Sequence, residues 1–189
     1  MKTRIAVLLI VLLLVAGGAI YYYEFYNQNL PPNENQNTPV SEITNFEECV
    51  AAGNLVMESY PRQCRANDQN FVEYIGNELE KTNLIRIDSP RPNTVVESPL
   101  EISGQARGTW YFEASFPVKL LDGNGAEISL NPSYIMTTED WMTEDFVPFK
   151  ATLEFIAPTT DTGTLVLEKD NPSGLPEYDD SLIVPVKFR

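Results

Sequence analysis

The chain has 189 residues, with 13 Lys and Arg against 27 Asp and Glu and no His, which gives a formal net charge of −14. A surface this acidic repels phosphate backbones, so nucleic-acid binding is not expected. It also gains nothing from anionic lipid headgroups, so membrane contact has to come from hydrophobic insertion. The lack of histidine removes the commonest general base and the commonest metal ligand.

The N-terminal segment predicts a membrane anchor. Residues 1–4 carry Lys2 and Arg4, and the run Ile5–Tyr23 has no charge. At about 1.5 Å per residue the run spans roughly 28 Å, close to the hydrocarbon core of a bilayer. The positive charges before it leave residues 1–4 in the cytoplasm and export the rest, as in a signal-anchor.

A cleaved signal peptide is the alternative interpretation, because Ala16-Gly17-Gly18-Ala19 offers small residues where a peptidase could cut. Either interpretation exports the body of the protein. No cysteine follows the apolar run directly, which excludes a lipoprotein anchor. Residues 24–42 are polar and interrupted by proline, so we expect a flexible linker there.

Residues 43–81 form a second, small unit that contains both cysteines, Cys49 and Cys64. An even number of cysteines in an exported segment predicts one disulfide, worth about 3 kcal/mol in the chain-entropy model. Two free thiols are the alternative. A metal site is not expected, because two thiolates without histidine do not complete a tetrahedral shell.

From residue 84 to residue 189 the sequence predicts an all-β, antiparallel two-sheet sandwich. Apolar residues alternate in several short runs, as at Leu182, Val184, Val186 and Phe188. The turn 122–125 predicts a hairpin, and Pro185 predicts an edge position for the last strand. The expected strands are Leu84–Asp88, Leu100–Gln105, Trp110–Glu113, Phe116–Asp122, Glu127–Tyr134, Phe149–Ile156, Gly163–Lys169 and Ser181–Phe188.

Several motifs in this region resemble a known family. They are Ile87-Asp88-Ser89-Pro90-Arg91-Pro92-Asn93, Ser98-Pro99-Leu100, Ile102-Ser103-Gly104, the stretch from Ala106 to Pro117, Asp140-Trp141-Met142 and the stretch from Leu165 to Glu177. Together, over residues 84–188, they resemble the immunoglobulin-like domain of bacterial spore germination. The resemblance implies an immunoglobulin-like sandwich and transfers no catalytic residue.

The segment from Cys49 to Cys64 resembles a short two-cysteine module of exported bacterial proteins. Its Tyr60-Pro61-Arg62 is also similar to the loop of a protease inhibitor, although such inhibitors carry more disulfides. The second resemblance implies an alternative function, inhibition or regulation of an envelope enzyme through the Cys49–Cys64 loop.

The residues argue against catalysis. No histidine is present to activate a serine or cysteine, and neither a Gly-x-Ser-x-Gly elbow nor a phosphate-binding glycine loop occurs. We therefore expect no enzyme activity, no cofactor and no metal. The oxygen-rich cluster in one predicted loop is interpreted as a solvated turn rather than a calcium site; it comprises Asp170, Asn171, Glu177, Asp179 and Asp180.

A binding surface is the remaining hypothesis. On a strand, Trp110 and Phe112 share one face and Tyr111 the other, so Tyr111 is expected outside if Trp110 fills the core. Polar and glycine-containing motifs outside the alternating strands either shape loops or form a contact surface. The candidate binding residues are Arg107, Trp110, Tyr111, Trp141, Asp170 and Asn171.

The sequence therefore predicts a non-catalytic, single-pass membrane protein with its body outside the cytoplasmic membrane, at the cell surface or in the periplasm. Its expected partner is a protein or glycan of the bacterial cell envelope, recognised by the immunoglobulin-like domain.

Overall fold

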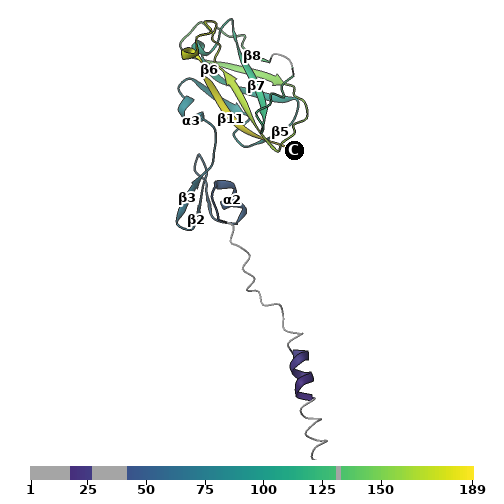
Figure 1. Ribbon diagram of the computed structural model, residues 1–189. Coiled ribbons are helices and arrows are strands. Elements are labelled where there is room, and N and C mark those ends of the chain that lie inside the picture. Colours follow the sequence, from purple (N-terminus) through teal and green to yellow (C-terminus); the bar gives the residue numbers. More distant parts are fainter. Residues whose placement is uncertain (1–17, 27–41, 131–132) are drawn as a thin grey trace, which may run out of the picture. The chain divides into compact units, whose positions relative to one another are not determined.

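The computed structural model describes residues 18–26, 42–130 and 133–189, and it divides the chain into two units, Met1–Glu42 and Ile43–Arg189. Residues 18–26 of the first unit are helical (Figure 1). Within the described residues, no helix has both the length and the apolar character that crossing a membrane requires. Most of the predicted anchor, 5–23, and most of the predicted linker, 24–42, lie outside the described residues.

The second unit begins with the residues of the two-cysteine module, 43–81. The module contains helix α2 (Phe46–Ala51) and a three-stranded antiparallel sheet in the order β1 (Val56–Met57), β2 (Gln63–Ala66) and β3 (Gln69–Val72). Asn45 caps the N-terminus of helix α2, because its side chain accepts a hydrogen bond from the Glu48 N–H at 2.8 Å. Cys49 and Cys64 are bonded to each other, so the predicted disulfide is confirmed.

A short helix, α3 (Glu78–Lys81), leads into the larger part of the unit, which is mostly β as predicted. Its strands form one hydrogen-bonded series in the order β4-β6-β9-β8-β7-β10-β11-β5. The strands are β4 (Ile85–Ser89), β5 (Val95–Val96), β6 (Leu100–Arg107), β7 (Ser115–Asp122), β8 (Tyr134–Met136), β9 (Phe146–Leu153), β10 (Thr162–Glu168) and β11 (Ser181–Phe188).

Strand β7 lets this series fold into two sheets, because it changes partner along its length. Its first residues, Ser115–Pro117, pair with β8, whereas Val118–Asp122 pair with β10. The two sheets enclose one core (Figure 1). The alternation predicted for the last strand is confirmed, since Leu182, Val184, Val186 and Phe188 are all buried. Aromatic rings pack edge to face in this core; the ring centroids of Phe116 and Phe149, for example, are 5.3 Å apart.

Two predicted strands are wrong. Trp110–Glu113 is instead the end of a 3-10 turn, η1 (Gly108–Trp110), followed by a tight reversal in which Glu113 and Ala114 have φ of 49° and 62°. Positive φ at two successive residues turns the chain too sharply for a strand to continue. In the predicted strand Glu127–Tyr134, Glu127 and Ser129 make isolated bridges, and β8 begins at Tyr134.

Pro185 was predicted to place the last strand at a sheet edge. The strand itself is not an edge strand, but Pro185 lies on a stretch of it that has no neighbouring strand on one side in the described part of the chain. Strand β11 lies between β10 and β5, but β5 reaches only Lys187 and Phe188. The Ile183 and Lys187 amides point to that flank, toward Asn77 and Thr94. Since alternate residues of a strand share a side, the nitrogen of Pro185 faces the same flank, where no strand needs its N–H.

Candidate functional site

The topology brings the six candidate binding residues to one end of the sandwich. The β6–β7, β8–β9 and β10–β11 connections all lie there, and hydrogen bonds join them. The Gly108 N–H donates to the Asp145 carbonyl at 3.1 Å, and the Asp170 N–H donates to the Trp110 carbonyl at 3.0 Å. A Cβ added to Gly108 would lie 2.2 Å from the Trp141 carbonyl oxygen, so the β8–β9 connection packs directly on this glycine.

Trp110 and Tyr111 are both buried, with 1% and 4% of their surface exposed. The expectation that Tyr111 lies outside is therefore wrong, because these residues follow a 3-10 turn and do not alternate as in a strand. The Tyr111 hydroxyl donates to the Val147 carbonyl at 3.0 Å, its ring packs edge-on against Phe116, and burial raises the pKa of the phenol. Neither ring is free to stack on a ligand.

Arg107 is committed to the loops around it. Its Nε donates to the Asn83 carbonyl and its Nη1 to the Glu144 carbonyl, both at 3.0 Å. The guanidinium also lies 4.2 Å from the ring centroid of Phe146, and Arg86 lies at 4.2 Å from the same ring. These contacts give Arg107 a structural role in holding the loops.

The β10–β11 connection is likewise bonded to itself. The Asn171 amide donates to the Leu175 carbonyl at 2.8 Å and to the Asp179 carboxylate at 2.7 Å. Partial burial raises the pKa of Asp170, and Lys81 forms an ion pair with Asp180 at 2.5 Å. Across the described ranges, no three acidic, cysteine or histidine side chains cluster in a way that could hold a metal ion.

A second site, which no sequence pattern predicted, is the junction at which the two-cysteine module meets the sandwich. Its first element is the buried carboxylate of Glu73, which accepts from Arg62 Nη2 at 2.6 Å and Nε at 2.9 Å. Asn93 of the sandwich donates to the same carboxylate at 3.1 Å. These hydrogen bonds, of which those from Arg62 have the largest effect, hold the pKa of Glu73 below its usual value.

A second buried carboxylate, Glu78, links both parts in the same way. Its oxygens accept from Arg91 Nη1 at 2.7 Å and Nη2 at 3.1 Å, and they also accept from the hydroxyl of Tyr60. Arg91 Nη2 donates to that hydroxyl at 2.6 Å. The pKa of the Tyr60 hydroxyl is raised, mainly by burial and secondly by its hydrogen bond to Glu78.

Asn77 attaches the junction to the flank of β11. Its Nδ2 donates to the Ser181 carbonyl at 2.9 Å, and its Oδ1 accepts from the Ile183 N–H at 2.7 Å, so one amide side chain replaces a neighbouring strand. Gly76 is required beside it. Its φ is +75°, and an added Cβ would lie 1.8 Å from the Ile183 carbonyl oxygen.

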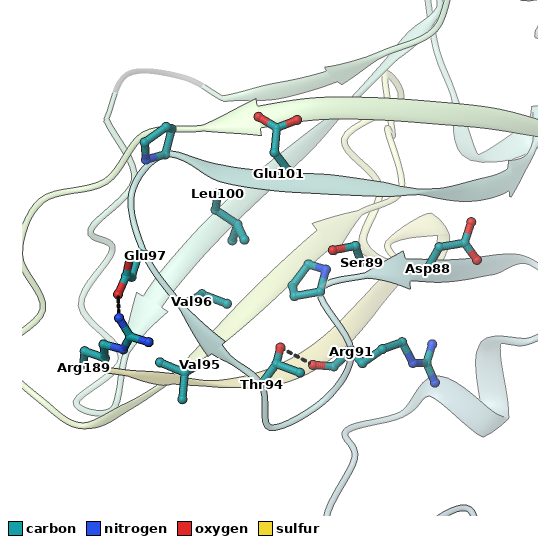
Figure 2. A pocket seen from close by; sticks show the side chains of 12 residues that line it. Asp88, Ser89, Arg91, Thr94, Val95, Val96, Glu97, Leu100, Glu101 and Arg189 are labelled. Atoms are coloured by element: carbon teal, nitrogen blue, oxygen red, sulfur yellow. Dashed lines mark hydrogen bonds and ion pairs between the residues drawn. The ribbon is translucent and has the colours of Figure 1, made fainter.

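A third surface is the open seam between β4 and β5, the two end strands of the series. A groove of about 570 Å³ lies there, and Figure 2 shows the side chains that line it. Arg189 pairs with Glu97 at 2.5 Å across one end, and Arg91 pairs with Glu78 at 2.7 Å. Both cations of the groove are therefore neutralised, and Asp88 and Glu101 leave its lining acidic.

The comparisons with known proteins bear on the sandwich. Residues 84–174, which contain β4 to β10, match the family model described as immunoglobulin-like domain of bacterial spore germination. The resemblance inferred from the sequence motifs is thereby confirmed. Neither the curated proteins nor the solved structures contain a match to the chain.

Proposed function

We propose that this protein is a membrane-anchored, non-catalytic binding protein of the bacterial cell envelope, in which the two-cysteine module and the immunoglobulin-like domain act as one recognition body. The observation that carries the proposal is the junction. Two buried carboxylates, Glu73 and Glu78, are each bonded to both parts. Because both buried carboxylates are fully hydrogen-bonded, they hold the module in place on the sandwich, and a ligand meets a single surface.

Export of this body is supported by the uncharged run Ile5–Tyr23 and by the disulfide. The run is long enough for a membrane anchor, with Lys2 and Arg4 ahead of it. Disulfides persist in oxidising compartments, and Cys49 and Cys64 are bonded. Both features support a body on the outer side of the cytoplasmic membrane.

The alternative, an enzyme inhibitor, is not favoured by the loop that would perform it. Inhibitory side chains must project into a target, whereas Arg62 is bonded to Glu73 and Tyr60 to Glu78. Both side chains of the Tyr60-Pro61-Arg62 loop stabilise the junction. A binding role for the whole body is the simpler account.

The test uses the full chain in intact cells or protoplasts, with one tag before Lys2 and another after Arg189. External protease is expected to remove the C-terminal tag and leave the N-terminal one, while in-cell cross-linking captures an envelope component. Separating the module from the sandwich with Gly76→Ala should release that component. A body protected from protease, or no captured component, would contradict the proposal.

A further inference from the structure

A groove on the outer face of β7, β10 and β11 is built from both parts of the recognition body. Its volume is about 370 Å³. Its floor includes one cross-strand row, because Thr164 pairs with Leu121 on one side and with Pro185 on the other. The turn at Asp122–Gly125 lines one end, and Tyr74 and Asn93 line the opposite flank. Tyr74 belongs to the module, in the segment between β3 and α3.

The position of Tyr74 is fixed by the junction. Asn93 Nδ2 donates to the Tyr74 carbonyl at 2.8 Å and to Glu73 at 3.1 Å, while the Asn93 N–H donates to the Pro185 carbonyl at 2.7 Å. The backbone of Tyr74 is thus tied to the floor of the groove, yet the residue remains 64% exposed. An aromatic ring that is exposed on a fixed backbone loses little entropy when it binds a ligand.

The chemistry of the lining selects the ligand. Among the residues that the structure describes, no Lys or Arg lines the groove, and the net charge of the protein is −14, so phosphate polymers and acidic chains are disfavoured. The carboxylate of Asp122 accepts from Thr159 at 2.7 Å and from the Asn124 and Ala126 amides at 2.9 Å. It is therefore occupied in shaping the turn rather than free to hold a cation.

What remains is an apolar floor, an exposed aromatic ring and neutral polar groups. Leu121 and Pro185 provide apolar surface, Thr162 and Thr164 provide hydroxyls, and Gly123 and Gly125 expose backbone. A pyranose ring has this same combination, an apolar face with hydroxyls around its edge, and it stacks on aromatic side chains. We propose that this groove binds an uncharged sugar chain of the cell envelope, with Tyr74 stacking on one ring. This inference rests on the proposed function.

The test measures retention of the purified full-length protein, in detergent, on peptidoglycan sacculi freed of protein and of anionic polymers. Tyr74→Ala should lower retention at least about tenfold, and Tyr74→Phe should keep it, because the ring does the stacking. Tyr178→Ala is the matched control, since Tyr178 is 53% exposed and does not line the groove. Thermal unfolding of each variant shows that the fold is kept.

Soluble oligosaccharides identify the source of the sugar. Competition by N-acetylglucosamine oligomers indicates the peptidoglycan glycan, and competition by glucose oligomers indicates a neutral polysaccharide; either supports the inference. Absence of binding to all three probes, equal retention of Tyr74→Ala and the parent, or an equal loss in Tyr178→Ala overturns it. A cross-linked envelope partner that persists without sugar binding would defeat this inference and leave the proposed function standing.

Discussion

The two-cysteine module and the sandwich are stabilised by different means. The two-cysteine module has a core of Phe46, Cys49, Cys64 and Ala66, in which both sulfur atoms belong to the disulfide. The sandwich has a far larger core that runs from Ile85 to Phe188 and includes fully buried Trp110 and Phe116. A unit as small as the module buries too little apolar surface to be stable by itself.

This difference explains why two of the three buried carboxylates in the described residues lie at the junction, while the third, Asp122, shapes a turn of the sandwich. Glu73 and Glu78 are buried at the junction, where the module gains the contacts that its own core cannot supply. The sandwich needs no such help, since its sheets bury apolar side chains on every core strand. The module is thus stabilised by one covalent link and by one polar junction, and each can be removed separately.

Reduction of the disulfide should give the largest effect. Cys49→Ser with Cys64→Ser should cost the module about 3 kcal/mol, because the closed loop no longer restricts its unfolded state. Trypsin should then cut at Arg65 in β2, while the sandwich retains its unfolding midpoint. Reoxidised parent protein is the control, and continued protection of Arg65 in the double variant would show that the junction alone suffices.

Gly76→Ala should come next, with a loss of about 2–3 kcal/mol, because a positive φ and an overlap with the Ile183 carbonyl act together. Gly53→Ala is the matched control for Gly76→Ala. Gly53 has φ of +77° and nothing within 4 Å of an added Cβ, so it reports the backbone cost alone, about 1 kcal/mol. Equal losses in denaturant unfolding of the two variants would mean that the module is not held at Gly76.

Arg107→Ala tests the loop end of the sandwich. We expect it to cost about 1 kcal/mol more than Arg86→Ala, because both cations stack on Phe146 but Arg86 bonds one backbone carbonyl, that of Thr82, whereas Arg107 bonds two in separate loops. Envelope retention should fall only in step with stability. A loss of retention at unchanged stability would instead support the contact surface expected from the sequence.

The smallest effect should come from Glu73→Gln, about 1 kcal/mol near pH 7, because Arg62 is half exposed and can be hydrated. The pKa of Glu73 is lower in the folded protein than its usual 4.5, so its ionisation stabilises the fold above that pH. This contribution is lost as the pH falls below about 4.5 and through the folded pKa. The variant should lack this part of the acid dependence in denaturant titrations, whereas the exposed Glu80→Gln should keep it.

Sequence patterns predicted most of the fold where one local rule sufficed. The alternation at Leu182–Phe188, the hairpin turn at 122–125 and the pairing of Cys49 with Cys64 each follow from nearby residues. They failed at Tyr111, because the 3-10 turn before it depends on the loops that Gly108 packs against. Sequence patterns also did not predict the junction, since no short-range pattern relates Glu73 to Asn93 or Asn77 to Ile183.

By itself, the sequence determined the class of the fold and the disulfide, because side-chain periodicity and cysteine number are local properties. Only the tertiary structure decided which side chains meet. In the folded protein Trp110 and Tyr111 are buried, and Arg107 donates hydrogen bonds to loop carbonyls. Tyr74 lies beside the row Leu121–Thr164–Pro185. Such contacts join residues far apart in the chain, and they arise when the two sheets close on a common core and leave one flank of β11 for the module to cover.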